Sequence, residues 1–286
     1  MAAEKKKHSQ LRVVWRRLKK NKLSMVGLGI VCVLAFCAVF ADFIAPYPYD
    51  QMNLLNTFQM PCREHLLGTD NFGYDILSRL IYGSRVSLIV GFISVGIGLL
   101  FGGLLGSVSA FYGGKTDNII MRGMDIMMSI PDLLLAISIA ASMGPGLTNA
   151  MIAVGISSIP SYARIVRASV LSTKEQEYIE AARAIGAGDR RLILKHIIPN
   201  SFAPVLVQAT LGVANAILVT SALSFIGLGI QPPRPEWGAM LAAGRSYIRD
   251  FWPIVTFPGI AIMITIIALN LLGDGLRDAL DPRLKQ

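Results

Sequence analysis

The residues whose types and spacing point to a function lie in one basic, hydrophilic interval, 171–200. Glu180, Ala181 and Ala182 form a small-residue cluster, Gly186 follows it closely, and Pro199 comes thirteen residues after the glycine. Small side chains let another protein surface approach closely, and a glycine lets the chain turn where a helix ends. The pattern predicts a docking surface; the alternative is a plain helix–turn–helix connector between two spans.

Two short helices are expected in this interval. Ser172 or Thr173 can cap the first helix, because a hydroxyl at that position accepts a hydrogen bond from a free backbone amide. At helical spacing, four apolar or small residues share one side of this helix: Tyr178, Ala181, Ala182 and Ile185.

The second helix is expected to follow a tight turn. The segment 186–188, Gly-Ala-Gly, suits a left-handed helix terminus. Asp189 is then the expected N-cap of a helix over 190–198. Pro199 is expected to let the next apolar span begin at an angle to that helix.

Residues that could perform catalysis are not gathered in this sequence. The histidines His8, His65 and His196 are far apart, and no HExxH pattern or His/Cys cluster accompanies them. Residues 114–116, Gly-Lys-Thr, resemble the end of a phosphate-binding loop, but Ser109 occupies the position of its first glycine. We therefore expect no metal site, no catalytic triad, no enzymatic activity and no cofactor or ATP bound by this chain itself.

Most of the chain is apolar. Hydrophobic residues make up 53% of it and charged residues only 16%, whereas an ordinary soluble domain carries about 25% charged residues. A helix that crosses the hydrocarbon core of a bilayer needs about 20 apolar residues. The sequence therefore predicts an all-α, polytopic membrane protein with six transmembrane helices, near 24–45, 86–111, 120–143, 147–163, 203–230 and 253–273.

Basic residues are distributed unevenly between the segments that join these spans. With a cytoplasmic N-terminus, 21 of the 27 Lys and Arg residues fall in inner segments and 6 in outer segments. Cytoplasmic loops carry the Lys and Arg excess, so both termini are predicted to be cytoplasmic. The expected organisation is a basic cytoplasmic segment 1–23, a first transmembrane helix 24–45, an extracytoplasmic loop 46–85, a transmembrane core 86–273 that contains the cytoplasmic interval 171–200, and a cytoplasmic tail 274–286.

The N-terminal segment predicts an amphipathic helix over 9–22. Apolar residues recur there at spacings of three and four, among many cations. Such a helix is expected to lie on the inner membrane surface, where anionic lipid attracts it. A nucleic-acid-binding arm is the alternative interpretation, which we disfavour, so the expected partner is the lipid bilayer and no nucleic acid.

Glycines and polar residues inside the spans predict packing and a pathway. Gly98, Gly102 and Gly106 form two GxxxG-like pairs, which are typical of close helix packing in lipid. Polar side chains inside a membrane are costly and usually face a pathway or a partner. Three of them are predicted to line a substrate pathway: Gln208, Asn215 and Asn270.

One ion pair is expected within the third span. Arg122 and Asp125 are three residues apart, a spacing that brings side chains together on a helix. A clearly central carboxylate is not expected in any span. A secondary transporter would need such an ion site, so this rival function is disfavoured.

The interval 171–200 resembles the EAA loop of ABC-importer permeases. That pattern is Glu-Ala-Ala, three residues, Gly, nine residues, and then Ile-x-Leu-Pro, with His196 here in place of the Ile and Ile198 in place of the Leu. The resemblance implies a type I importer core of five helices, one peripheral N-terminal helix, and a surface that contacts cytosolic ATPases. The residues assigned to this surface are Glu180, Ala181, Ala182, Gly186, Ala187, Asp189, His196 and Pro199.

Other segments resemble the dipeptide/oligopeptide/nickel branch of these permeases, and its second, C-type subunit in particular. They are 65–70 (HLLGTD), 75–79 (DILSR), 82–88 (YGSRVSL), 232–238 (PPRPEWG) and the tail from Gly273. Tyr74 departs from this pattern, which has Arg between the residues that correspond to Gly73 and Asp75.

The resemblance implies the partners and the location of the chain. The partners are a homologous second permease subunit, two cytosolic ATPases that carry ATP and Mg, and an extracytoplasmic solute-binding protein. The location is a bacterial inner (plasma) membrane, and the implied function is peptide uptake through a pathway of which this chain forms half. Nickel and glutathione import remain open, because systems for these solutes share the same motifs.

Overall fold

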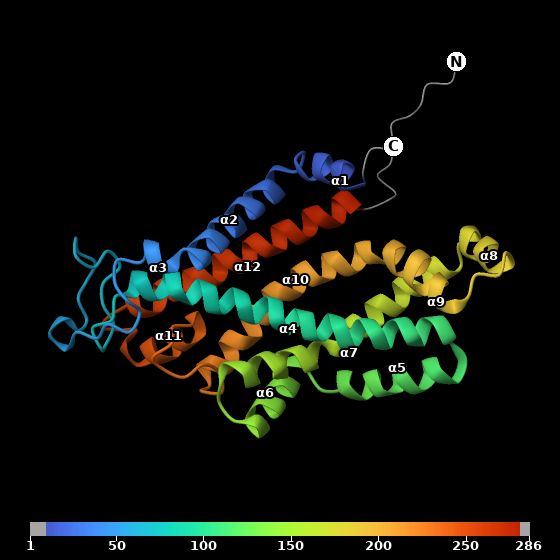
Figure 1. The fold of residues 1–286 in the computed structure, drawn as a ribbon. Coiled ribbons are helices and arrows are strands. Elements are labelled where there is room, and N and C mark those ends of the chain that lie inside the picture. The colour runs from blue at the N-terminus through green and yellow to red at the C-terminus, as the bar shows by residue number, and fades with distance from the viewer. Residues whose placement is uncertain (1–9, 281–286) are drawn as a thin grey trace, which may run out of the picture.

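The computed structural model describes residues 10–280 and shows an elongated bundle of helices (Figure 1). Within these residues no strand forms, and extended backbone pairs only at one isolated bridge between Thr69 and Asp75. The predicted all-α class is confirmed for this part of the chain. The expected basic cluster at Lys5, Lys6 and Lys7 and the end of the tail, 281–286, lie outside the described residues.

The N-terminal helices lie along one side of the bundle. Helix α1 spans Gln10–Leu18, α2 spans Lys22–Val39 and α3 spans Ala41–Ile44. Asn21 caps α2, since its side chain accepts a hydrogen bond of 3.2 Å from the amide of Ser24. Helix α2 packs on α12, Pro253–Leu280, and leaves most of its other apolar side chains exposed, as a peripheral membrane helix does.

Helix α4, Ile76–Tyr112, is the longest element and packs mainly on α7, Leu147–Lys174. A Cβ atom at Gly102 would lie 2.5 Å from the carbonyl oxygen of Ile159, and one at Gly106 would collide with the carbonyl oxygen of Ala163. The predicted packing role of these glycines is confirmed, because only glycine allows this close approach of α4 and α7. The helix starts ten residues before the predicted end of the outer loop, so that loop covers 46–75.

The third predicted span, 120–143, is not one helix. It is divided between α5, Gly114–Met128, and α6, Asp132–Met143, whose axes differ by 86°. Pro131 precedes α6 directly and has no amide hydrogen to continue a helix. Gly114 begins α5 immediately after α4, so the Gly-Lys-Thr segment joins two helices.

The remaining elements complete the bundle. Helix α8 spans Glu177–Ala184, α9 spans Asp189–Arg191, α10 spans Ile198–Phe225 and α11 spans Trp237–Gly244. A π-helical turn, Leu192–Ile197, joins α9 to α10 without a break. Short 3-10 turns lie at Leu54–Asn56 and Arg245–Tyr247.

The count of apolar helices differs from the prediction. Of the described residues, four helices are long and apolar enough to cross a membrane, or five if α5 and α6 together make one span. Helix α7 is long but is not counted, because polar residues interrupt its apolar run, among them Asn149, Ser157, Ser158, Ser161 and Arg164. The four continuous spans are Lys22–Val39, Ile76–Tyr112, Asp189–Phe225 and Pro253–Leu280.

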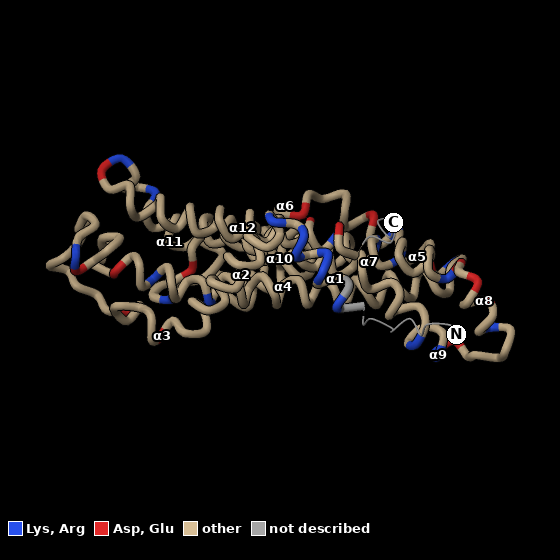
Figure 2. Tube along the Cα trace, turned by 90° about the horizontal axis from the view of Figure 1, so that it is seen from above, with Lys and Arg blue, Asp and Glu red and all other residues tan. Residues whose placement is uncertain are grey.

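The two ends of the bundle carry different segments. Helices α1, α8 and α9 and the C-terminal end of α12 lie at one end, and the loop 46–75 lies at the other (Figure 1). A hydrogen bond of 3.4 Å from Arg17 Nη1 to the carbonyl of Ala279 joins α1 to α12 at the first end. Lys and Arg occur on α1, α8 and α9, and the part of the molecule that carries the loop also holds Lys and Arg (Figure 2).

Candidate functional site

Helix α8 is held on the bundle by one apolar side. Ile179 is 1% exposed and belongs to a buried cluster with Phe111 of α4 and Leu192 of the π-helical turn. Ala182 and Ala187 are partly buried against the same cluster. These contacts fix the orientation of α8, so that its opposite side is displayed.

The displayed side of α8 carries small and apolar residues. Ala181 is exposed, as are Tyr178 (44%) and Ile185 (87%). The helical spacing predicted Ala182 on this side too, and this is wrong, because residues 179 and 182 together face the bundle while 178, 181 and 185 face outward. An apolar surface beside exposed Glu180 is typical of a site where another protein binds.

Gly186 makes the turn that follows α8. Its φ of +84° lies in the left-handed region, and the amide of Ala187 donates to the carbonyl of Ala182 over 3.1 Å. The predicted left-handed helix end is confirmed at this residue. Gly188 is extended instead, with φ −69° and ψ 157°, and it occupies the N-cap position that was predicted for Asp189. Asp189 is the first residue of α9, where its negative charge still favours the helix start.

Two further details of this interval differ from the prediction. Helix α7 runs on to Lys174, and Gln176 precedes α8, so neither Ser172 nor Thr173 caps it. Thr173 Oγ1 donates instead to the carbonyl of Ser169 within α7.

The helix after Asp189 does not stop before Pro199. The amide of Ile198 donates to the carbonyl of Ile193, a π-type bond, and α10 continues through Pro199. Proline lacks an amide hydrogen and its ring crowds the preceding turn, so a wider turn accommodates it. His196 is partly buried within the π-helical turn, and Asn200 Nδ2 donates to its carbonyl over 2.6 Å.

Polar contacts connect the end of α7, and with it α8, to α4 and α5. Lys174 Nζ donates to the carbonyl of Phe111 at the end of α4 over 2.6 Å. Arg167 of α7 binds Asp117 of α5 through two contacts, Nε to Oδ1 at 2.7 Å and Nη2 to Oδ2 at 2.5 Å. Ser109 also donates to this carboxylate. These contacts join the C-terminal end of α7 to both α4 and α5.

The expected pair between Arg122 and Asp125 does not form. The partner of Asp125 is Arg164 of α7, with Nη2 and Oδ1 2.8 Å apart. Because α5 lies along α7, a cation on the neighbouring helix reaches the carboxylate more directly than one on the same helix.

A cavity of about 260 Å³ lies between α4, α7 and α10 and the start of α6. Gln208 and Asn215 both line this cavity. They are two helical turns apart on one face of α10, as residues that line one pathway must be. Asn270 is exposed on α12 and is not among the residues that line this cavity. The structure thus brings together two of the three predicted pathway residues.

One charged residue that lines the cavity was not predicted. Asp132, the first residue of α6, places a carboxylate at the break between α5 and α6 and at the cavity. The expectation that no span holds a clearly central carboxylate is wrong in this respect. The signal in the sequence was Pro131, which marks a break inside an apolar window and leaves the next residue at a helix start.

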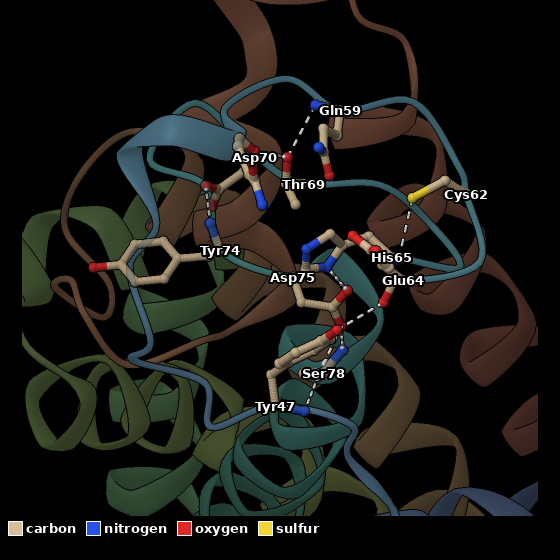
Figure 3. Close-up of polar contacts among 11 residues, drawn as sticks. Tyr47, Gln59, Cys62, Glu64, His65, Thr69, Asp70, Tyr74, Asp75 and Ser78 are labelled. Atoms are coloured by element: carbon tan, nitrogen blue, oxygen red, sulfur yellow. Dashed lines mark hydrogen bonds and ion pairs between the residues drawn. The ribbon is translucent and has the colours of Figure 1, made fainter.

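The loop 46–75 is folded around a buried polar cluster (Figure 3). Asp75 caps α4 and accepts from the amide and from Oγ of Ser78, each over 2.7 Å. Its second oxygen lies 2.9 Å from Nδ1 of buried His65, and the ring of Tyr47 packs against that histidine with centroids 4.9 Å apart. This cluster ties the loop to the first turn of α4.

Tyr74 takes part in the same loop. The Arg79 guanidinium lies over its ring, 4.5 Å from the centroid, and also approaches Asp70 to 3.9 Å. Burial raises the pKa of the Asp70 carboxyl, although the amides of Phe72 and Tyr74 donate to it. An aromatic side chain here thus provides a cation–π partner where the family pattern has Arg.

Two family models match most of the chain, on either side of residues 62–97. Residues 98–286 match the model of the binding-protein-dependent transport system inner membrane component. Residues 9–61 match the model of the N-terminal transmembrane domain of oligopeptide transport permease C.

Curated relatives match over almost their full length. The dipeptide transport system permease protein DppC of Alkalihalophilus pseudofirmus is 48% identical over 277 residues, 97% of this chain and 91% of the relative. The di/tripeptide transport system permease protein DppC of Pseudomonas aeruginosa is 47% identical, over 97% of this chain and 93% of the relative. The dipeptide transport system permease protein DppC of Escherichia coli K12 is 47% identical, over 96% and 94%.

Solved structures share the fold. A chain of the MetNI methionine ABC transporter in an inward-facing conformation superposes with a TM-score of 0.61 and 18% identity, over 72% of this chain and 98% of that chain. A chain of an amino acid ABC transporter gives a TM-score of 0.55 over 71% of this chain and 94% of that chain. Together, the family models and relatives show that this chain belongs to the binding-protein-dependent transport system inner membrane components, in their dipeptide/oligopeptide permease C branch.

Proposed function

We propose that this chain is a permease subunit of an ATP-driven importer that takes up small peptides. One observation carries the coupling role: α8 displays Ala181, Tyr178 and Ile185 while Ile179 anchors it on a buried cluster that reaches α4 and α10. A displayed apolar surface with a rigid base can receive a partner and pass on its motion. The peptide substrate is proposed from the relatives, whose names specify dipeptide or di/tripeptide transport.

The proposed complex contains this chain, a homologous second permease, two cytosolic ATPases and an extracytoplasmic solute-binding protein. ATP and Mg bind to the ATPases and not to this chain. One of the two ATPases seats on α8 and on the turn at Gly186 of this chain, and nucleotide drives the permease by binding one conformational state more tightly than the other. The second permease supplies the other half of the pathway, since the cavity of about 260 Å³ is below the roughly 300–1,000 Å³ of a ligand pocket.

The proposed topology has six crossings of the bacterial inner membrane, with both termini inside. Helix α7 counts as a crossing, because its 28 residues extend about 42 Å and several of its polar residues line the cavity. Helices α5 and α6 together make a broken crossing. The excess of Lys and Arg, 21 inside against 6 outside, supports this orientation, and α1 and α8 lie at the same end of the bundle.

The test is transport by the reconstituted complex in proteoliposomes. Labelled Ala-Ala should be taken up only when ATP is inside with the ATPases and the binding protein is outside. Parallel uptake of glutathione and of nickel separates the other solutes of the branch. Uptake of Ala-Ala driven by an ion gradient without ATP would instead support a secondary transporter and contradict the proposal.

A further inference from the structure

The cavity between α4, α7 and α10 has a polar lining that internal hydrogen bonds satisfy only in part: Ser94, Ser157 and Ser158 donate to backbone carbonyls. Within the described residues 10–280, the side chains of Asp132, Ser161, Gln208 and Asn215 line it and have no hydrogen-bond partner. Tyr162 also lines it, is 2% exposed, and its hydroxyl is buried without a partner. Tyr162 is the buried one of these five, and a buried or intramembrane polar group without a partner is costly, so its hydroxyl and the free polar groups beside it indicate a ligand or a pathway.

The charge of this lining is of one sign. Asp132 is an acid, and none of the described residues that line the cavity is Lys, Arg or His. The basic residues nearest in the sequence on α7 are engaged elsewhere, Arg164 with Asp125 and Arg167 with Asp117. The carboxylate is therefore balanced by no cationic side chain of the lining, and the start of α6 offers it only a partial positive charge.

The position of Asp132 also suits a passing cation. It is the first residue of α6, where the 86° bend interrupts the span, and ionisable side chains within membrane-spanning segments usually mark substrate or ion pathways. The other lining groups are amides and hydroxyls, which can accept from or donate to a peptide without a charge preference. Only the carboxylate discriminates by charge.

We propose that Asp132 determines specificity within the pathway by binding the positively charged groups of a peptide in transit, so that cationic peptides pass faster than anionic ones. This inference rests on the proposed function and deepens it. The solute-binding protein selects peptides as a class, and Asp132 adds a preference among them by charge. The interaction is transient, because the side chain is exposed and solvent screens the attraction.

The experiment compares initial uptake of Lys-Ala and Glu-Ala by the full complex in proteoliposomes. Both peptides are used at concentrations that saturate the binding protein, whose affinity for each is measured separately. Asp132→Asn should lower the ratio of Lys-Ala to Glu-Ala uptake by about fivefold, and Asp132→Glu should keep the wild-type ratio. Asp278→Asn is the matched control, since it removes an exposed carboxylate of α12 away from the cavity.

An unchanged ratio in Asp132→Asn, in a complex that assembles normally, would overturn the proposal. Asp132→Ser gives a second reading if the Asn variant does not assemble, and failure of both to assemble would assign the residue a structural role and overturn the proposal too. If the wild type takes up both peptides and the Asp132 variants leave the uptake ratio unchanged, this inference alone is refuted and the proposed function stands. Absence of any peptide uptake by the wild type refutes the proposed function, and this inference with it.

Discussion

Replacing two adjacent alanines of α8 should give opposite kinds of defect. Ala181 is exposed on the side that we propose contacts an ATPase, whereas Ala182 is partly buried against the cluster of Ile179 and Leu192. A glutamate at either position adds the same charge and volume one residue apart. The pair therefore separates loss of docking from loss of folding.

The expected magnitudes follow from these environments. Ala181→Glu leaves the isolated permease within about 0.5 kcal/mol of wild-type stability, because surface changes away from special features cost little. In the complex the new carboxylate is buried without a partner, which costs about 3 kcal/mol and weakens ATPase binding about 150-fold. Ala182→Glu buries that charge within the permease itself, so the chain should lose about 3 kcal/mol of stability before any partner binds.

The assay measures ATPase retention on the tagged permease, ATP-driven peptide uptake, and thermal unfolding of the permease in detergent. Ala181→Ser, which keeps the residue small, is the control and should behave as wild type in all three. Normal ATPase binding and uptake by Ala181→Glu would refute the docking assignment. An unfolding temperature lowered equally by both glutamates would refute the assignment of the two sides of α8.

Three further predictions test the topology, the packing and the nucleotide site. Cysteines introduced at 57 and 176 should react with a membrane-impermeant label from opposite sides of the membrane, and labelling of both from one side would contradict the proposed topology. Gly106→Leu should destabilise the permease by about 1–3 kcal/mol, because the new side chain meets the backbone of α7. Thermal unfolding measures this loss, and Gly103→Leu is the control, since its side chain would enter open space. An equal loss of stability in both variants would refute the packing role. The isolated chain should show no saturable ATP binding, and specific binding that Lys115→Ala abolishes would overturn the assignment of nucleotide to partner subunits.

The sequence predicted the features that depend on local chemistry. Gly186 could be assigned a left-handed turn because glycine adopts positive φ with little cost, and its neighbours end a helix. The glycines of α4 could be assigned to packing because small residues four apart form one flat stripe. The helical class followed from long apolar windows, since in lipid the backbone must satisfy its own hydrogen bonds.

Periodicity alone did not decide which side of a helix meets which neighbour. The spacing grouped Ala181 with Ala182, but the buried position of Ile179 turns Ala182 towards the bundle. The pairing of Asp125 likewise depended on α7, which supplies Arg164 from thirty-nine residues away in the chain. Such choices depend on contacts between distant segments, which local spacing does not specify.

The pathway residues show most clearly which properties the sequence predicts and which depend on tertiary packing. Their polarity was visible in the sequence, and it singled out Gln208, Asn215 and Asn270 for their cost inside a membrane. Only the packing of α4, α7 and α10 gathers the first two at one cavity and leaves Asn270 exposed on α12. Asp132 joins them because the chain bends by 86° after α5, and a bend of that size is set by how α6 packs against α7 and α10. The sequence by itself thus determined which residues were costly and where helices could turn, while the tertiary packing decided which of those residues share a space.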